Sequence, residues 1–383
     1  MIVFVFLSGQ VEHSTTKETK MNKSSRHRGK RTAFEKEKFT NKRGLIMMIL
    51  YDPNQPVSLL EFGIQIPIRD SRVTKTMESI CADAKLYTRR RQWHVDHITE
   101  TLNRQDLLRV HTPSYVGRLF SADLAEEIIA TYELIASDGN YYRYAPEQAK
   151  QPLSNLFNRI RVKAAGSVQC GRLALSHGFC FYFAGGMHHA HGDHGSGFCL
   201  INDIVIAARK LQAENLVRKV WIIDVDVHKG DGTAALTSGD ETIRTLSIHM
   251  AAGWPLNGAP ILADNQPNPV FIPSDIDIPI QSGEEAVYLR RLEEGLSRLA
   301  EFGGADLAIV VCGADPYKKD ELPSTQWLNL NLLQMRKRDR LVFNFLKAHK
   351  IPGAYLMAGG YGDEIWRVYA QFLLWALKKG VFV

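Results

Sequence analysis

The segment KVWIIDVDVHKGDGT (219–233) joins an apolar run to a dense group of charged side chains. The apolar part is typical of a strand that is buried on both faces of a parallel sheet. Asp224, Asp226 and His228 follow at alternate positions, so we expect the three side chains to share one face while the strand lasts. Carboxylates and an imidazole buried together are costly without a cation. The segment therefore predicts a metal site at the end of a buried strand.

A second apolar run, LAIVVCGAD (307–315), supplies a distant ligand for this site. Asp315 ends the run, and Gly313 allows the backbone to approach closely. Together with Asp226 and His228, Asp315 gives three protein ligands and leaves a position for water, which is the pattern of catalytic zinc. The alternative is that these aspartates cap the helices that follow them. Three aspartates and a histidine within residues 224–231 favour the metal site.

Other apolar runs extend this pattern along the chain and alternate with helical spacing. Continuous Val, Ile and Leu runs separated by helices imply a parallel sheet with helices on both faces, an α/β fold. The carboxyl ends of such strands form the usual ligand site, so we expect the polar residues that follow them to converge there. No internal repeat or linker follows residue 48, which predicts one domain over residues 47–383. The further strand-like runs are 48–52, 179–186, 242–249, 275–280 and 354–361, and the clearest helical segments are 201–216, 284–302, 331–348 and 363–379.

Twin histidines occur in GGMHHAHGDHGSGFCLIND (185–203). His188 and His189 follow two glycines and could bind metal or act as acid and base near neutral pH. Each needs a partner for its far ring nitrogen, and Asp224 and Asp231 are available. His191 and His194 are interpreted as residues of the rim or of a loop.

A third motif, AGGYG (358–362), places a tyrosine after a strand-like run. The glycines expose a turn and leave Tyr361 projecting toward the same edge of the sheet. A phenol there can donate a hydrogen bond to a developing oxyanion. The alternative is that Tyr361 only packs.

Five motifs occur in this order: GGMHHAHGDHGSGFCLIND (185–203), DVDVHKGDGT (224–233), TLSIH (245–249), GAD (313–315) and AGGY (358–361). Their order and intervals resemble the histone deacetylase family in the broad sense, which includes acetylpolyamine amidohydrolases and acetoin-utilisation proteins. The resemblance covers roughly residues 48–380. It implies the three-layer arginase/deacetylase fold, in which a parallel eight-stranded sheet has helices on both faces.

The resemblance also implies catalytic roles. His189 would be the general base and then the acid toward the leaving amine, and His188 would be its electrostatic partner. Asp224 would orient His188, and Asp231 would orient His189. Tyr361 would stabilise the oxyanion. Cys199 is interpreted as a packed thiol rather than a nucleophile.

Ligands and substrate contacts follow from the same resemblance. One Zn²⁺ per chain would be bound by Asp226, His228 and Asp315. Phe198 would form one wall of an acyl-lysine tunnel, and Trp254 the opposite wall. A structural monovalent cation, K⁺, would be bound by Asp224, Asp226, His228 and Ser247.

The predicted activity is zinc-dependent hydrolysis of an acetyl-amide bond, which releases acetate and a free amine. The substrate would be acetyl-lysine in a peptide or protein, or another acetylated amine such as an acetylpolyamine. One alternative is a ureohydrolase with two manganese ions, and another is a catalytically silent binding module with a basic nucleic-acid-binding arm. Two segments leave substrate choice open: PYKKDELPSTQW (316–327) departs from the family pattern, and SDGNYYRYAP (137–146) is the candidate rim loop.

Charge and cysteine content limit the other functions. Residues 1–46 carry eleven Lys or Arg and four Glu, whereas the remainder has 36 basic and 37 acidic side chains, so the net charge of +6 belongs to the N-terminal segment. The composition of that segment predicts a basic, disordered extension. It either has no role or, because of SRHRGKR (25–31), serves as a nucleic-acid-binding or targeting arm. Five cysteines without a CxxC spacing predict a reducing, cytoplasmic location. No apolar run is long enough for a membrane span, so we expect no membrane partner.

Overall fold

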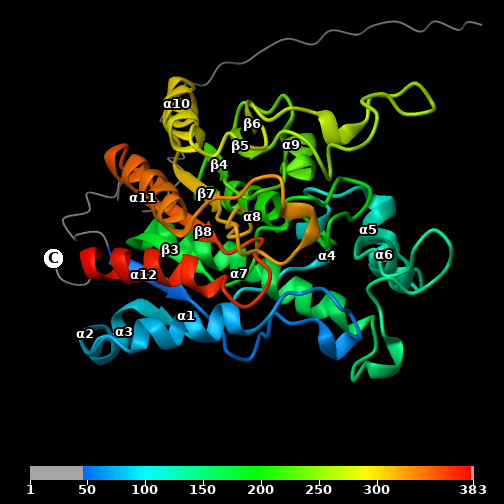
Figure 1. Cartoon of the computed structure of the whole chain (residues 1–383), viewed down its shortest axis with the longest axis horizontal. Helices are drawn as coiled ribbons and strands as arrows, with labels where there is room; N and C mark the ends of the chain where they lie inside the picture. The colour runs from blue at the N-terminus through cyan, green and yellow to red at the C-terminus, as the bar shows by residue number, and fades with distance from the viewer. Residues whose placement is uncertain (1–45, 381–383) are drawn as a thin grey trace, which may run out of the picture. The chain divides into compact units, whose positions relative to one another are not determined.

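Eight parallel strands form the central sheet of the computed structural model, which describes residues 46–380 (Figure 1). Their order across the sheet is β2-β1-β3-β8-β7-β4-β5-β6, and every neighbouring pair is parallel. This confirms the α/β class and the parallel eight-stranded sheet. The strands are β1 (Ile46–Leu50), β2 (His94–Val95), β3 (Gly178–Tyr182), β4 (Val220–Asp224), β5 (Ile243–Met250), β6 (Ile276–Ile280), β7 (Leu307–Val311) and β8 (Gly353–Leu356).

Two hydrophobic cores lie on opposite faces of the sheet, because successive strand residues point to opposite sides. In β3, for example, Phe179 and Phe181 belong to one core, and Cys180 and Tyr182 belong to the other. The first core receives apolar residues from α1 (Ser71–Cys81), α10 (Tyr288–Glu301), α11 (Leu332–Ala348) and α12 (Trp366–Gly380). The second receives them from α5 (Pro113–Leu119), α6 (Leu124–Thr131), α7 (Asn155–His177) and α8 (Asp203–Ala213). Shorter helices are α2 (Ala84–Thr88), α3 (Arg90–Trp93), α4 (Arg104–Leu107) and α9 (Asp231–Thr237).

The strand β4 is shorter than its sequence predicts. It ends at Asp224. Beyond this point the backbone N–H groups of Asp226 and His228 bond to nearby aspartate side chains instead of to a neighbouring strand. Asp224 Oδ1 accepts a hydrogen bond from the Asp226 N–H at 3.1 Å, and Asp226 Oδ1 accepts one from the His228 N–H at 3.2 Å. The expectation that these three residues share one face of a strand is therefore wrong beyond Asp224. Turns bring them together instead.

Four neighbouring strands lead to the predicted site. β3, β8, β7 and β4 are adjacent in that order, and the chain leaves each of them at the same edge of the sheet. The twin histidines follow β3, the aspartate-rich turn follows β4, Asp315 follows β7, and Tyr361 follows β8. Segments separated by up to about 170 residues thus meet at the carboxyl ends of the strands, where open parallel sheets bind ligands.

The basic extension lies outside the described residues, apart from Ile46, which begins β1. Within residues 46–380, no helix combines the length and the apolar character that a membrane crossing requires. The two-residue strand β2 was not predicted from the sequence, since it is too short to give a periodic signal.

Candidate active site

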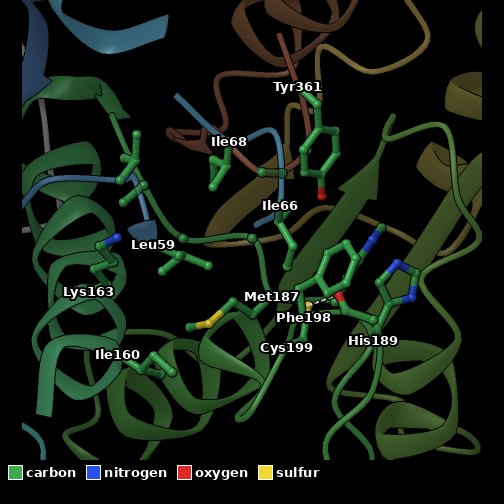
Figure 2. A pocket seen from close by; sticks show the side chains of 18 of the residues that line it. Leu59, Ile66, Ile68, Ile160, Lys163, Met187, His189, Phe198, Cys199 and Tyr361 are labelled. Carbon is green, nitrogen blue, oxygen red and sulfur yellow. Dashed lines mark hydrogen bonds between the residues drawn. The ribbon is translucent and has the colours of Figure 1, made fainter. Parts of the chain in front are cut away.

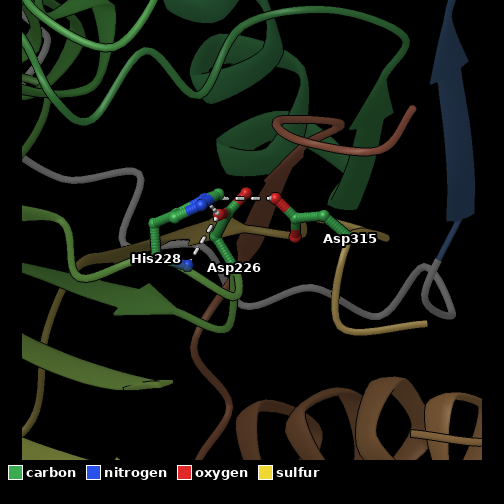
Figure 3. Close-up of side chains that lie close together, drawn as sticks. All are labelled: Asp226, His228 and Asp315. Carbon is green, nitrogen blue, oxygen red and sulfur yellow. Dashed lines mark hydrogen bonds and ion pairs between the residues drawn. The ribbon is translucent and has the colours of Figure 1, made fainter. Parts of the chain in front are cut away.

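Asp226, His228 and Asp315 form a buried cluster at the ends of β4 and β7 (Figure 3). One ligand atom from each residue lies within 4.8 Å of the other two. Nδ1 of His228 is 3.5 Å from Asp226 Oδ1 and 3.7 Å from Asp315 Oδ2. The three side chains predicted as metal ligands therefore present two oxygens and one nitrogen to a common point.

The hydrogen bonds of the cluster leave one carboxylate oxygen unsatisfied. Asp315 Oδ1 accepts from the Val227 N–H at 3.1 Å, whereas the buried Asp315 Oδ2 has no hydrogen-bond partner. A bound ion would satisfy a buried carboxylate oxygen that lacks a hydrogen-bond partner. Gly359 leaves the necessary space, because a Cβ atom at this position would collide with the carboxylates of Asp315 and Asp226. The residues fit a divalent cation of the zinc type.

The electrostatics of the cluster favour exchange of protons for a metal ion. Burial and the negative charge of Asp226 raise the pKa of Asp315 to about 7. Burial opposes protonation of His228, but hydrogen bonds and charge from Asp226 and Asp315 outweigh it and raise the pKa to about 9. Protons thus partly neutralise the cluster in the absence of a cation, and a divalent ion would displace them.

A side chain of helix α11 holds the loops that carry the cluster in place. Arg338 is completely buried, and its Nη1 donates to the carbonyl oxygens of Val225 at 3.0 Å and Gly313 at 2.7 Å. Its charge is balanced by Asp339, 2.7 Å from Nη2. One guanidinium therefore ties the turn after β4 to the turn after β7.

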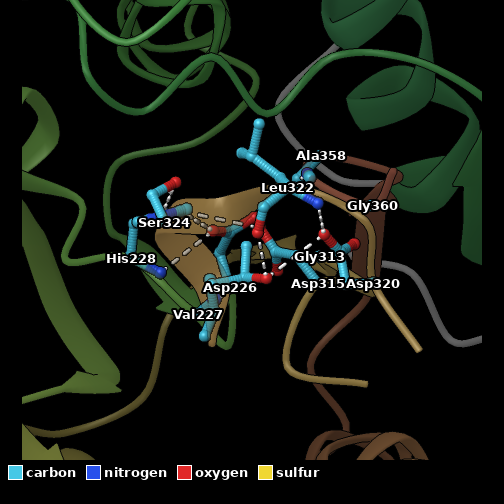
Figure 4. Close-up of polar contacts among 12 residues, drawn as sticks. Asp226, Val227, His228, Gly313, Asp315, Asp320, Leu322, Ser324, Ala358 and Gly360 are labelled. Carbon is cyan, nitrogen blue, oxygen red and sulfur yellow. Dashed lines mark hydrogen bonds and ion pairs between the residues drawn. The ribbon is translucent and has the colours of Figure 1, made fainter. Parts of the chain in front are cut away.

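The segment that follows Asp315 also contributes to the site (Figure 4). Ser324 Oγ lies 3.1 Å from Nε2 of His228. Asp320 accepts hydrogen bonds from the N–H groups of Leu322 at 2.9 Å and Tyr361 at 2.8 Å. The stretch that departs from the family pattern thus holds both a predicted metal ligand and the backbone of the predicted oxyanion donor.

Each of the twin histidines has its own carboxylate. Nδ1 of His188 is 2.7 Å from Asp224 Oδ2, and Nδ1 of His189 is 2.6 Å from Asp231 Oδ1. The two imidazole rings are adjacent, with centroids 3.9 Å apart. Both pairs are buried, and they are the pairs that the sequence suggested.

The pKa values of the two imidazoles are shifted in opposite directions. Burial opposes protonation of His188, but the charges of Asp224 and Asp226 outweigh it and raise the pKa to about 10. Burial and the positive charge of His188 lower the pKa of His189 to about 3. Neighbouring groups whose pKa values are driven apart in this way are typical of acid–base sites.

A buried carboxylate in α8 holds the turn that presents the histidines. Asp203 is completely buried and accepts hydrogen bonds from the N–H groups of Gly186 at 3.0 Å and Met187 at 2.7 Å, and from Ser167 Oγ. Gly185 has a φ of 78°, a left-handed conformation that favours glycine. The sequence analysis did not single out Asp203 or Ser167, although Asp203 belongs to the LIND end of the twin-histidine motif.

His191 belongs to the interior network rather than to the rim. Its Nε2 lies 3.0 Å from Asp231 Oδ2, the oxygen that His189 does not use. The backbone oxygen of His191 contacts Nδ1 of His111 at 2.8 Å, and both imidazoles are buried. His191 thus lies in a loop, as one of the two interpretations had it, but not at the rim. The rim interpretation fits His194, whose ring is about half exposed, hydrogen-bonds to its exposed neighbour Asp193 and stacks on His191.

An outer pocket leads to the cluster. Phe198 and Trp254, the predicted tunnel walls, both line it, and Trp254 packs with its ring centroid 4.4 Å from that of His189. Tyr361 borders both this outer pocket and the inner pocket that contains the cluster, and Figure 2 shows its hydroxyl directed into the inner pocket. Burial and nearby carboxylates raise the pKa of Tyr361, so its hydroxyl keeps its proton. The rim loop contributes Arg143 to this entrance.

The residues predicted for a monovalent cation are close in the sheet. Ser247 of β5 is the register partner of Asp224 in β4. Ser247 Oγ also bonds to Nδ1 of His249 at 3.0 Å. The K⁺ site itself stays a prediction.

The fold and this constellation define a member of the arginase/deacetylase class, and comparison with known proteins gives the family. The histone deacetylase domain family matches residues 66–377, so the chain belongs to that family.

An uncharacterised protein from Picosynechococcus is 32% identical over 231 residues, which cover 60% of this chain and 72% of that protein. Histone deacetylase HOS1 of Saccharomyces cerevisiae is 28% identical over 197 residues, or 51% of this chain and 40% of the yeast protein. The acetoin utilization protein AcuC of Staphylococcus aureus is 26% identical over 267 residues, or 69% of this chain and 65% of the bacterial protein. The alignments thus span less than two thirds of the last two relatives.

Proposed function

We propose that the chain is a zinc-dependent deacetylase that hydrolyses the acetyl-amide bond of acetyl-lysine or of a related acetylated amine. One observation carries this proposal: a buried Asp–His–Asp cluster with an unsatisfied oxygen lies beside two imidazoles that each have their own carboxylate. No nucleophilic serine or cysteine is needed, because water is the attacking group.

The bound metal would polarise the acyl carbonyl and lower the pKa of the attacking water. Asp226, His228 and Asp315 would hold it. These residues are already gathered by their own backbone hydrogen bonds and by Arg338.

His189 is the proposed base and acid. Its Nδ1 faces the Asp231 carboxylate, which fixes the tautomer with the proton on Nδ1 and leaves Nε2 free to accept a proton from the water. The same Nε2 then donates that proton to the nitrogen of the leaving amine. His188, kept cationic by Asp224 and Asp226, would hold the water and stabilise negative charge beside it.

Tyr361 is the proposed oxyanion donor. Its hydroxyl retains the proton and points into the pocket from the turn after β8. A donor aimed at the developing oxyanion stabilises the transition state more than the ground state. Collapse of the tetrahedral species breaks the C–N bond and gives acetate and a free amine.

A turnover assay on a substrate panel tests the proposal. The zinc-loaded protein would be given acetyl-lysine peptides and acetylpolyamines, with acetate release as the readout. We expect His189→Ala and Tyr361→Phe to lower kcat by about 100-fold or more. Exposed residues of the same types provide matched controls, Tyr87→Phe and His97→Ala, which should keep wild-type rates. No hydrolysis of any panel member by the zinc-loaded protein, or unchanged rates in both active-site variants, would contradict the proposal.

A further inference from the structure

The pocket that contains the Asp–His–Asp cluster extends beyond the catalytic residues into an apolar cavity. Its far part lies on the opposite side of the pocket from His189 (Figure 2). The volume of the whole pocket, including the part at the cluster, is about 120 Å³, whereas one water molecule needs about 10–15 Å³. Many of the side chains that line the pocket are apolar, among them Val57, Leu59, Ile66, Ile68, Leu156 and Ile160.

Lys163 introduces a charge into this apolar surface. It lies on α7, is half-buried, and lines the cavity, with its ammonium directed toward the pocket in Figure 2. Within residues 46–380, its Nζ makes no hydrogen bond and no ion pair. The acidic residues that line the pocket, Asp226 and Asp315, belong to the metal cluster.

The two arginines that line the pocket make hydrogen bonds within the chain. Nη1 of Arg72 donates to the carbonyl oxygens of Ala358 at 3.0 Å and Gly360 at 2.9 Å. Arg159 forms an ion pair with Glu61 and donates to the Ser58 oxygen at 2.8 Å. Arg72 Nε also lacks a hydrogen-bond partner. Lys163 differs from both arginines because, within residues 46–380, its charged group has neither a hydrogen bond nor an ion pair.

An unpaired ammonium in an apolar cavity is unfavourable. Burial, followed by the positive charges of Arg159 and Arg72, lowers the pKa of Lys163 to about 7. An anion that entered the cavity would restore the charged form and pair with it. A neutral alkyl chain would contact the apolar walls of the cavity but would leave the ammonium without a partner.

We propose that this pocket selects acyl groups that end in a carboxylate, with Lys163 binding the carboxylate and the apolar walls enclosing the methylene groups. This rests on the proposed function, because the acyl carbon must lie at the Asp–His–Asp cluster. The reaction is the same hydrolysis: the water oxygen bonds to the acyl carbon, the C–N bond breaks, and the amine takes a proton. The products are a free amine and a dicarboxylate such as succinate or glutarate.

The test compares acyl groups of matched length on one lysine peptide. Succinyl and glutaryl groups carry the terminal carboxylate, butyryl and pentanoyl groups lack it, and acetyl reports the basic reaction. We expect the zinc-loaded protein to hydrolyse one of the two dicarboxylic substrates with a kcat/KM about 10- to 100-fold above that of its neutral counterpart, since hydrogen bonds to charged groups have this strength. In Lys163→Met this preference should disappear while acetyl hydrolysis continues.

Two further variants and one binding measurement separate the possible explanations. Lys163→Arg should keep part of the preference, and Lys75→Met, which removes an exposed lysine on α1, should keep all of it. Binding of the better dicarboxylic peptide to Tyr361→Phe, measured by fluorescence anisotropy, should weaken about 10- to 100-fold when Lys163→Met is added.

Each outcome decides the proposal. Acetyl hydrolysis without a preference for a terminal carboxylate, or a preference that survives Lys163→Met, would overturn the role of Lys163 and leave the deacetylase proposal standing. Failure to hydrolyse any acyl group, including acetyl, would refute both.

Discussion

Nδ1 of His189 lies 2.6 Å from Oδ1 of Asp231, and both side chains are buried. Burial opposes ionisation of Asp231, but the interaction with His189 outweighs it and lowers the pKa of the carboxyl group. The carboxylate therefore stays ionised. It fixes the orientation and the tautomer of the imidazole that we assign as the base.

Loss of the Asp231 charge should slow catalysis without unfolding the protein. We expect Asp231→Asn to lower kcat by about 100-fold with little change in KM, because a partner that orients a catalytic group acts mainly in the transition state. Steady-state kinetics on the acetyl substrate measures this. The surface pair of Asp193 and His194, 2.7 Å apart and largely exposed, gives the matched control Asp193→Asn, which should behave as wild type. Equal rates in the two variants would refute the orienting role.

His191 binds the second oxygen of Asp231 at 3.0 Å and should act through it as a positioning residue. Without this bond the carboxylate holds more negative charge for His189, so the pKa of His189 rises. We expect His191→Ala to lower kcat by about 10-fold and to move the acidic limb of the kcat/KM profile to higher pH. A full pH profile checks both effects. His194→Ala should change neither the rate nor the profile, and a shift of the same size in that variant would contradict the assignment.

Arg338 should contribute to stability more than any exposed residue of α11. Arg338→Met leaves Asp339 as an unpaired buried charge and removes the donors to Val225 and Gly313. Breaking a buried ion pair on one side typically costs about 3–5 kcal/mol, so we expect the free energy of unfolding to fall by that amount. Urea unfolding monitored by circular dichroism measures it. Lys337→Met, at the exposed neighbouring position, should change stability by less than about 0.5 kcal/mol.

Metal affinity should rise with pH. Binding requires an ionised Asp315 and a neutral His228, whose pKa values in the metal-free protein are raised to about 7 and about 9. Below these values the ion competes with protons, so the apparent affinity should increase from pH 6 to pH 9, by up to about tenfold per pH unit for each proton released. Titration of the metal-free protein with Zn²⁺ against a chelator of known affinity gives the slope. A pH-independent affinity would mean that the cluster does not exchange protons for metal.

The sequence predicted most of the sheet because its strands are buried on both faces. Continuous apolar runs such as LAIVV (307–311) have no other simple interpretation when helices separate them. The carboxyl-end rule then placed Asp315 and Tyr361 near the aspartate-rich turn. The predicted strand length was wrong at β4, since the Asp224 and Asp226 carboxylates accept hydrogen bonds from nearby backbone N–H groups and end the strand, and no periodicity reports such bonds.

The supporting residues were beyond the reach of sequence patterns. Arg338 and Lys163 are ordinary basic residues within helices, where a charged side chain usually indicates a solvated face. His191 carried the right residue type but had no signal that separated it from the exposed His194. Only the tertiary arrangement shows that Arg338 joins two distant turns and that Lys163 faces a cavity.

The metal content of the purified protein tests the central claim most directly. Elemental analysis of the wild-type chain and of Asp315→Ala, expressed in parallel and matched for folding by circular dichroism, measures it. The Asp–His–Asp site predicts one zinc ion per wild-type chain and essentially none in Asp315→Ala. Two manganese ions per chain, or the same zinc content in both proteins, would contradict it.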